Sequence, residues 1–223
     1  MTAVIICDMW DTTICKSAER RVTEMAPRLN DFIKPLRHKG VFIIHAPWGV
    51  MGFYEGTPER ERARAAPFVE PPMLLDWQDL DPACEGSLPL DDSDWCDDTP
   101  KCPIREIEER QAWPWTRQIA SIEIFDDDAV SSDGQEIYNL LEQRGIQNII
   151  MTGVHLNRCV LGRPYGIRQM VMLAKNVVLV RDLTDGLYDP RQPPFVSHEE
   201  GVGLLVKHVE QHWCPSVRSI DML

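Results

Sequence analysis

Short apolar runs alternate with segments of helical periodicity along most of this 223-residue chain, and this alternation limits the fold most strongly. The apolar runs predict buried strands over residues 3–8, 41–44, 119–125, 148–152 and 176–180, with a last short strand near Val217. Strands that alternate with helices form parallel sheets covered on both faces. The sequence therefore predicts a three-layer α/β/α domain whose parallel sheet has about six strands.

Helices are predicted between these strands. Residues 17–39 carry apolar side chains at helical spacing, with Ser17 as the expected N-cap. Ser197 and Glu200 form a capping-box pattern that opens the helix expected over residues 199–211. Further helices are expected over residues 58–66, 133–144 and 156–173.

Residues 67–118 interrupt the alternation. This stretch is rich in proline, and between Asp76 and Asp98 it holds nine acidic residues and no lysine or arginine. It lacks the apolar periodicity of an independent core. We therefore expect an acidic surface insertion within a single domain that spans residues 1–223.

Charge and composition restrict the partners. The formal net charge of -12 argues against a surface for nucleic acid or for an anionic membrane. No apolar run reaches the ~18 residues of a membrane-spanning helix, and we expect no signal peptide from the residues that open the chain. Seven cysteines, mostly in or beside regular elements, favour a reducing compartment. The sequence thus predicts a cytoplasmic protein.

No cofactor or metal site is predicted. No glycine-rich nucleotide-binding motif follows a strand, and His45 lacks a neighbouring aspartate at metal-ligand spacing. Cys84, Cys96 and Cys102 leave open a disulfide, best placed between Cys96 and Cys102, or part of a zinc site. Because no CxxC pair or nearby histidine occurs, zinc is the weaker alternative.

The turn after the fourth long apolar run carries the chemistry. Cys159 is placed just inside a helix N-terminus, where the helix dipole favours the thiolate, although a buried packing cysteine is an equal alternative. Asp8, His45 and Asp182 also fall at or just past strand ends. Ligands bind outside the carboxyl ends of parallel strands, so we expect these side chains at one edge of the sheet. A carboxylate beside a cysteine suits nucleophilic catalysis.

Several polar and aromatic residues are candidates for the wall of a pocket at this edge. Trp10 follows Asp8 closely, which favours a pocket role. The other candidates are His45, Arg117, Asn157 and Tyr165, together with the aromatic residues Trp48, Phe53 and Tyr54.

Asp8 after the first strand and the run Thr-Gly-Val-His-Leu-Asn-Arg-Cys-Val after the fourth resemble the isochorismatase-like cysteine hydrolases, which include nicotinamidases and N-carbamoylsarcosine amidohydrolases. The similarity covers about residues 3–66 and 119–219. It implies a Rossmann-like α/β fold and cleavage of a C–N bond in a small amide or ureido compound. It also implies a homo-oligomer, because family members are commonly oligomers.

The resemblance implies roles for individual residues. Cys159 would be the nucleophile and Asp8 the general base. A cis peptide between Val154 and His155 would direct the backbone N–H groups of His155 and Cys159 at the oxyanion.

One family residue is missing. A lysine is expected near residues 123–127, where this chain reads Glu-Ile-Phe-Asp-Asp. Arg117, Arg163 or Arg168 could replace its charge, but an arginine does not shuttle protons at neutral pH. The alternative function is therefore a catalytically altered or inactive relative that binds a small molecule or a partner protein.

Overall fold

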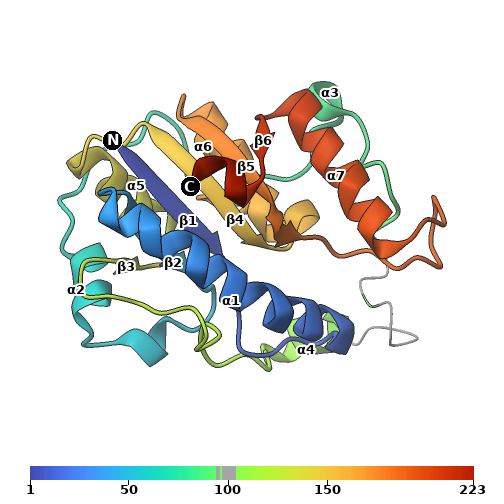
Figure 1. Cartoon of the computed structure of the whole chain (residues 1–223), viewed down its shortest axis with the longest axis horizontal. Helices are drawn as coiled ribbons and strands as arrows, with labels where there is room; N and C mark the ends of the chain where they lie inside the picture. The colour runs from blue at the N-terminus through green and yellow to red at the C-terminus, as the bar shows by residue number, and fades with distance from the viewer. Residues whose placement is uncertain (94–95, 97–103) are drawn as a thin grey trace.

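A six-stranded parallel sheet forms the centre of the molecule (Figure 1). The computed structural model describes residues 1–93, 96 and 104–223. The strand order is β3-β2-β1-β4-β5-β6, and every neighbouring pair is parallel. The strands are β1 (Thr2–Cys7), β2 (Phe42–Ala46), β3 (Ala129–Val130), β4 (Asn148–Val154), β5 (Asn176–Asp185) and β6 (Ser216–Val217). The predicted three-layer parallel architecture is confirmed.

Alternate residues of β1 serve two separate cores. Val4 and Ile6 pack with the apolar face of α1 (Lys16–His38), whereas Ala3, Ile5 and Cys7 pack with side chains from helices of the opposite layer. That layer contains α5 (Gly134–Gln143), α6 (Ile167–Met172) and α7 (His198–His212), and in Figure 1 α1 lies on the other side of the sheet from α5 and α6. Burial on both faces explains why the strands read as continuous apolar runs.

The helix termini follow local side-chain chemistry. The capping box of α7 forms as expected, since Ser197 accepts from the backbone N–H of Glu200 and the Glu200 carboxylate accepts from that of Ser197. Helix α1 begins one residue earlier than predicted, with Cys15 rather than Ser17 at its N-cap. The shorter elements are α2 (Pro58–Arg64), α3 (Pro82–Glu85), α4 (Ile104–Arg110), η1 (Met51–Tyr54), η2 (Leu156–Val160) and η3 (Ser219–Met222).

The prediction of a strand over residues 119–125 is wrong. Ile122 is buried against α1, but it reaches that core from a turn in which its N–H donates to the carbonyl of Ile119. The third strand is instead Ala129–Val130, which pairs with β2. Apolar spacing alone does not distinguish a strand from a turn that inserts isolated apolar side chains into a core.

The helix predicted over residues 156–173 is divided. A single π-helical turn, η2, precedes α6, and Pro164 and Gly166 lie between them. Proline has no backbone N–H for a continuing helix. A Cβ on Gly166 would lie 2.8 Å from the carbonyl oxygen of Val160. The break therefore allows the chain to fold closely over the turn that carries Cys159.

Part of residues 67–118 is fixed to the helical layer by one buried carboxylate. Glu85, in α3, accepts hydrogen bonds from Arg168 Nε at 2.7 Å, His208 Nε2 at 2.9 Å and Trp213 Nε1 at 2.8 Å. Burial raises the pKa of Glu85, but these hydrogen bonds outweigh it and lower the pKa to about 2. We call these four residues the Glu85 clasp.

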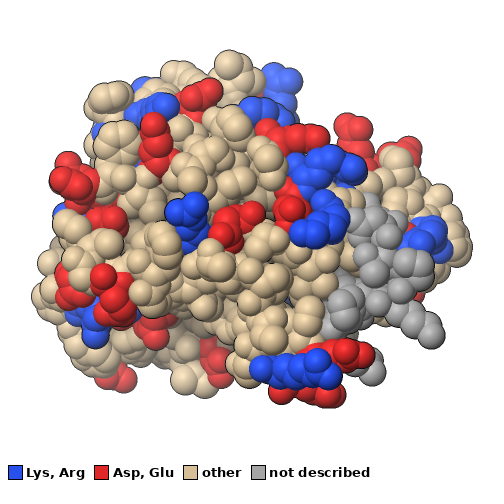
Figure 2. All heavy atoms as spheres, turned by 90° about the horizontal axis from the view of Figure 1, so that it is seen from below, with Lys and Arg blue, Asp and Glu red and all other residues tan. Residues whose placement is uncertain are grey.

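The surface in Figure 2 carries acidic and basic side chains side by side. None of the helices in the described part of the chain is long and apolar enough to cross a membrane.

Candidate active site

The site lies at the carboxyl ends of β1 and β4, which are neighbours in the sheet. Asp8 follows β1 directly, is fully buried and has a left-handed backbone with φ 49°. Its Oδ1 accepts from the backbone N–H of Trp48 at 2.7 Å, and its Oδ2 accepts from Arg163 Nε at 3.1 Å. The carboxylate is thus held in place from two sides.

Gly153 permits the close approach of β4 to β1. Its φ is 110°, and a Cβ at this position would lie 2.1 Å from the carbonyl oxygen of Cys7. Only glycine has no side chain to meet that contact. The approach brings the turn after β4, with Cys159, next to Asp8.

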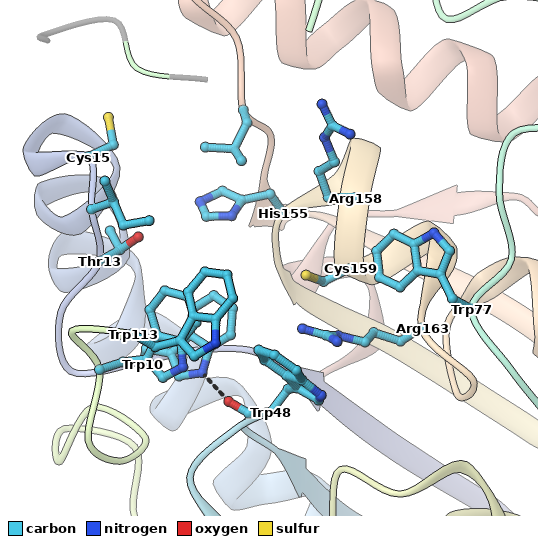
Figure 3. A pocket seen from close by; sticks show the side chains of 13 residues that line it. Trp10, Thr13, Cys15, Trp48, Trp77, Trp113, His155, Arg158, Cys159 and Arg163 are labelled. Carbon is cyan, nitrogen blue, oxygen red and sulfur yellow. Dashed lines mark hydrogen bonds between the residues drawn. The ribbon is translucent and has the colours of Figure 1, made fainter. Parts of the chain in front are cut away.

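Cys159 is half-buried at the end of η2, and its sulfur points into a cavity (Figure 3). Burial is the main cause that raises the pKa of the Cys159 thiol to about 12, and the hydrogen-bonded Asp8 carboxylate adds to it. Arg163 and the backbone N–H of His155 act in the opposite direction without compensating. Burial therefore outweighs the stabilisation of a thiolate that was expected from the helix N-terminus, and the resting group is a thiol beside a carboxylate.

Arg163 supplies a positive charge beside Asp8. Besides Nε, its Nη2 lies 3.1 Å from the same carboxylate oxygen, and the guanidinium stacks 4.4 Å over the ring of Trp48. Burial lowers the pKa of Arg163, but the Asp8 carboxylate outweighs this and raises it overall. Of the three arginines that the sequence left open, only this one contacts Asp8. Arg117 lies over Phe53, and Arg168 belongs to the Glu85 clasp.

The peptide bond between Val154 and His155 is cis, as the resemblance implied. The imidazole of His155 lines the cavity, yet the side chain is only 4% exposed and its Nε2 has no hydrogen-bond partner among the described residues. Burial lowers the pKa of His155 to about 4. The imidazole is therefore neutral at physiological pH.

The cavity has a volume of about 290 Å³ and a predominantly aromatic wall. Trp10 lines it as expected, and Trp48 does so too. Five tryptophans line the cavity: Trp10, Trp48, Trp77, Trp113 and Trp115. The other described residues of the wall are Thr13, Ile14, Cys15, His155, Arg158, Cys159, Arg163 and Leu187. No lysine, aspartate or glutamate occurs in this part of the wall.

Four predicted pocket residues lie elsewhere, and these predictions are corrected. His45 is fully buried in the sheet, where its ring nitrogens pair with Gln118 and Asp128 at 3.0 Å each. Asn157 fixes the backbone of Leu187 through two hydrogen bonds of 2.9 Å. Tyr165 is completely buried below the site, and Arg117 covers the ring of Phe53. Each satisfies local polar or apolar contacts instead of facing the cavity.

Two further expectations about this edge are corrected. Asp182 lies within β5, which is longer than predicted, and its carboxylate accepts from the N–H and hydroxyl of Ser219 at 2.7 Å each. Phe53 and Tyr54 do not line the cavity. Tyr54 instead accepts from the backbone N–H of Gln118 at 2.8 Å.

The sequence reasoning missed the contribution of residues 67–118 to the site. Trp77, Trp113 and Trp115 all come from this stretch and all line the cavity. The run Trp-Pro-Trp at 113–115 was the available signal, because two tryptophans beside a proline are unusual in an acidic surface loop.

The described cysteines outside the site show no metal arrangement. Cys84 is exposed and its thiol donates to Asp81 at 3.1 Å, while Cys96 is buried in a small cluster with Cys15. Cys102 lies outside the described residues, so the Cys96–Cys102 disulfide stays a prediction. Within the described ranges, no group of three or more His, Cys, Asp or Glu side chains could hold a metal ion.

Solved structures match nearly the whole chain, although no protein-family model and no curated protein matches the sequence. A cysteine hydrolase from Pseudomonas syringae pv. phaseolicola 1448A is similar with a TM-score of 0.61 and 16% identity, covering 99% of this chain and 90% of that one. An isochorismatase family protein from Desulfovibrio vulgaris subsp. vulgaris str. Hildenborough has a TM-score of 0.57 and 13% identity, covering 99% and 95%. An isochorismatase from Pseudomonas putida KT2440 has a TM-score of 0.56 and 13% identity, covering 100% and 90%.

The six-stranded parallel sheet, covered by helices on both faces, is shared with these solved structures. The chain therefore has the isochorismatase-like α/β fold. At these low identities the likeness concerns the fold, and the chemistry has to be argued from the residues.

Proposed function

We propose that this protein is a cysteine hydrolase that cleaves the C–N bond of a small amide or ureido compound. One observation carries the proposal: Asp8 contacts both the Cys159 thiol and the Arg163 guanidinium, beside a tryptophan-lined cavity into which the sulfur points. A nucleophile, a base and a fixed positive charge are the groups that acyl transfer requires.

Acylation begins from the neutral thiol. As the sulfur of Cys159 attacks the carbonyl carbon, Asp8 takes the thiol proton, so that no free thiolate has to exist beforehand. Proton transfer during the attack is required because burial raises the pKa of the Cys159 thiol to about 12. The oxyanion accepts hydrogen bonds from the backbone N–H groups of His155 and Cys159. Asp8 then returns the proton to the leaving nitrogen as the C–N bond breaks, which leaves a thioester.

Deacylation uses the same groups. Asp8 takes a proton from a water molecule while the water oxygen attacks the thioester carbon. Collapse of the second tetrahedral intermediate breaks the C–S bond, and the proton on Asp8 returns to the sulfur. The products are an acid and an amine, or a carbamic acid and an amine for a ureido substrate.

Arg163 acts as a permanent charge in this scheme. A guanidinium stays protonated throughout, so Asp8 carries every proton transfer while Arg163 keeps a positive charge beside it. Because Arg163 contacts Asp8 through Nε and Nη2, it also fixes the direction of the carboxylate toward the sulfur.

A second candidate is a catalytically altered or inactive relative that binds a small molecule or a partner protein. Two observations support this candidate. Asp8 is contacted by an arginine, and no lysine occurs among the described residues that line the cavity. In addition, the pKa of the Cys159 thiol is raised to about 12.

Turnover and thiol labelling separate the two candidates. A panel of small amides and ureides is followed by release of ammonia or amine, with Cys159→Ser and Asp8→Asn as inactive variants. Labelling of Cys159 by iodoacetamide is compared by mass spectrometry with that of Cys84, an exposed thiol. The hydrolase predicts turnover that both substitutions abolish, and a Cys159 label that Asp8→Asn slows. No turnover, with Cys159 labelled no faster than Cys84, supports the binding candidate instead.

A further inference from the structure

Arg163 is restrained by two tryptophans that come from different parts of the chain. Its guanidinium carbon lies 4.4 Å from the ring centroid of Trp48, which follows β2, and 5.5 Å from that of Trp77, which belongs to residues 67–118. In the view of Figure 3, Trp48 lies below the Arg163 side chain and Trp77 lies above it. Both distances are within the ~6 Å over which an indole face attracts an arginine.

The ion pair with Asp8 leaves part of this arrangement open. Nε and Nη2 of Arg163 both meet Oδ2 of Asp8, each at 3.1 Å. Contacts to a single oxygen fix the distance between the two groups, but the guanidinium plane can still tilt about that oxygen. A ring next to the guanidinium opposes this tilt, because tilting moves the cation away from the ring face. The two indoles thus supply a restraint that the ion pair lacks.

Trp77 is itself held by the turn that carries the site. Its ring lies so close to the backbone of Gly162 that a Cβ there would come within 2.8 Å of Cζ2 and 2.9 Å of Cε2. The backbone N–H of Gln78 donates to the carbonyl of Gly162 at 2.7 Å, and Trp77 Nε1 donates to Asp79 at 2.9 Å. Any larger residue at position 162 would displace the indole. The ring beside Arg163 therefore has a fixed place.

Burial of apolar surface does not account for Trp77 at this position. The residue is 38% exposed, and it belongs to no hydrophobic core of the described residues. Its contacts are instead with Gly162, with Asp79 and with the guanidinium of Arg163. Of these three, the guanidinium is the one that the face of an indole attracts more strongly than an aliphatic side chain would.

We infer that Trp77 is a positioning residue of the active site, because its indole fixes the guanidinium of Arg163 against the carboxylate of Asp8. The inference rests on the proposed function, in which Asp8 carries the protons and Arg163 supplies the permanent charge beside it. Trp77 acts on the reaction through Arg163, so the loss of its ring slows the chemical step and leaves substrate affinity nearly unchanged. A residue of the acidic stretch thus takes part in setting the geometry of the base.

A double-mutant cycle between Trp77→Leu and Arg163→Met measures whether the two residues act together. It uses the most rapidly hydrolysed compound of the amide and ureide panel. We expect Trp77→Leu to lower kcat about tenfold and to change KM less than about twofold. In the Arg163→Met background, the same substitution should lower kcat less than about twofold. Arg163→Lys replaces Arg163→Met if that variant does not fold, since an ammonium group lacks the planar face of a guanidinium.

Three further variants sharpen the cycle. Trp77→Phe keeps an aromatic face and should recover most of kcat. Gly162→Ala displaces the indole without changing Trp77 or Arg163, so kcat should fall as in Trp77→Leu, and the two substitutions together should lower it little further. Phe68→Leu, at an exposed aromatic position of residues 67–118, is the matched control and should leave kcat and KM unchanged.

Urea denaturation of the same variants gives a readout that does not depend on turnover. Trp77→Leu should lower the urea midpoint more in the unmodified protein than in Arg163→Met, because only the former has a guanidinium for the ring to hold. Additive effects on both kcat and the urea midpoint overturn the inference. A Trp77→Leu variant with a raised KM and an unchanged kcat also overturns it, since that pattern belongs to a residue that binds the substrate directly.

The proposed function fails separately. Coupling between Trp77 and Arg163 in urea denaturation, without turnover of any amide or ureide, shows that the indole fixes the guanidinium in a protein that does not hydrolyse these compounds. Turnover that Cys159→Ser abolishes and Trp77→Leu leaves unchanged has the opposite meaning: the protein is a hydrolase, and Trp77 is not a positioning residue.

Discussion

At the scale of single residues, the contact between Asp8 and Arg163 decides the electrostatics of the site. The two residues are 155 positions apart in the chain, and Asp8 is fully buried. A buried carboxylate is tolerated when it is paired and hydrogen-bonded, and here Trp48 and Arg163 supply those partners. The arginine therefore contributes both to stability and to the orientation of the base.

Arg163→Met leaves this carboxylate without a counter-charge. We expect the free energy of unfolding to fall by about 3–5 kcal/mol, as for other broken buried pairs, and kcat/KM to fall by roughly 100-fold. Arg163→Lys keeps the charge but not the two-nitrogen contact, so its losses are smaller. Urea denaturation and steady-state kinetics measure both quantities.

The control for this prediction is Arg117→Met, since Arg117 is exposed and does not contact Asp8. It should leave both quantities unchanged. If Arg163→Met is as active as the unmodified protein, Arg163 has no part in catalysis.

At the scale of elements, the site depends on how closely β4 and β1 pack and on how residues 67–118 are fastened. Gly153 sets the first distance, because any larger residue would meet the backbone of Cys7. The Glu85 clasp fastens α3, because Glu85 is hydrogen-bonded to residues of α6 and α7 and to Trp213. Trp77, which lines the cavity, precedes α3 in the same described segment.

Gly153→Ala should destabilise the protein by at least about 3 kcal/mol, because the added Cβ both clashes and requires a left-handed backbone. Gly203→Ala in α7 is the matched control, since its Cβ would meet no atom within 4 Å. There we expect a gain of roughly 0.5–1 kcal/mol from helix propensity. Thermal denaturation compares the two variants, and similar effects at both positions would contradict the close-approach argument.

Glu85→Gln breaks a buried charge pair and should lower the free energy of unfolding by about 3–5 kcal/mol. Because the clasp fastens α3, limited proteolysis should also cut the stretch around residues 82–85 faster than in the unmodified protein. Glu70→Gln, at an exposed position within residues 67–118, serves as the control. Unchanged cleavage rates would show that other contacts hold the stretch in place.

At the scale of the whole molecule, the parallel sheet was predictable and much of the site was not. Strands buried on both faces, such as β1, are continuous apolar runs, so their positions can be read from the sequence. The prediction of a strand over residues 119–125 was wrong because Ile119 and Ile122 belong to a turn. Their side chains are apolar because they pack against the core formed with α1. Asp8 directly follows β1 and Cys159 lies in the turn after β4, and both were found because the carboxyl ends of these two strands share one edge.

The resemblance to oligomeric relatives leads us to predict a homo-oligomer. Light scattering coupled to size-exclusion chromatography measures the assembled mass at several protein concentrations. A single monomeric species at every concentration would contradict the prediction. The measurement is made at moderate ionic strength, because salt screens the repulsion between copies that each carry an excess of acidic residues.

The sequence by itself determined the layers, the sheet and the two residues of the proposed nucleophile and base, because burial and strand ends leave periodic, local patterns. The tertiary structure alone decided that Arg163 pairs with Asp8, that His45 pairs with Asp128, and that tryptophans from residues 67–118 line the cavity. These contacts join residues far apart in the chain. Their energy depends on distance and burial in three dimensions, which no local pattern records.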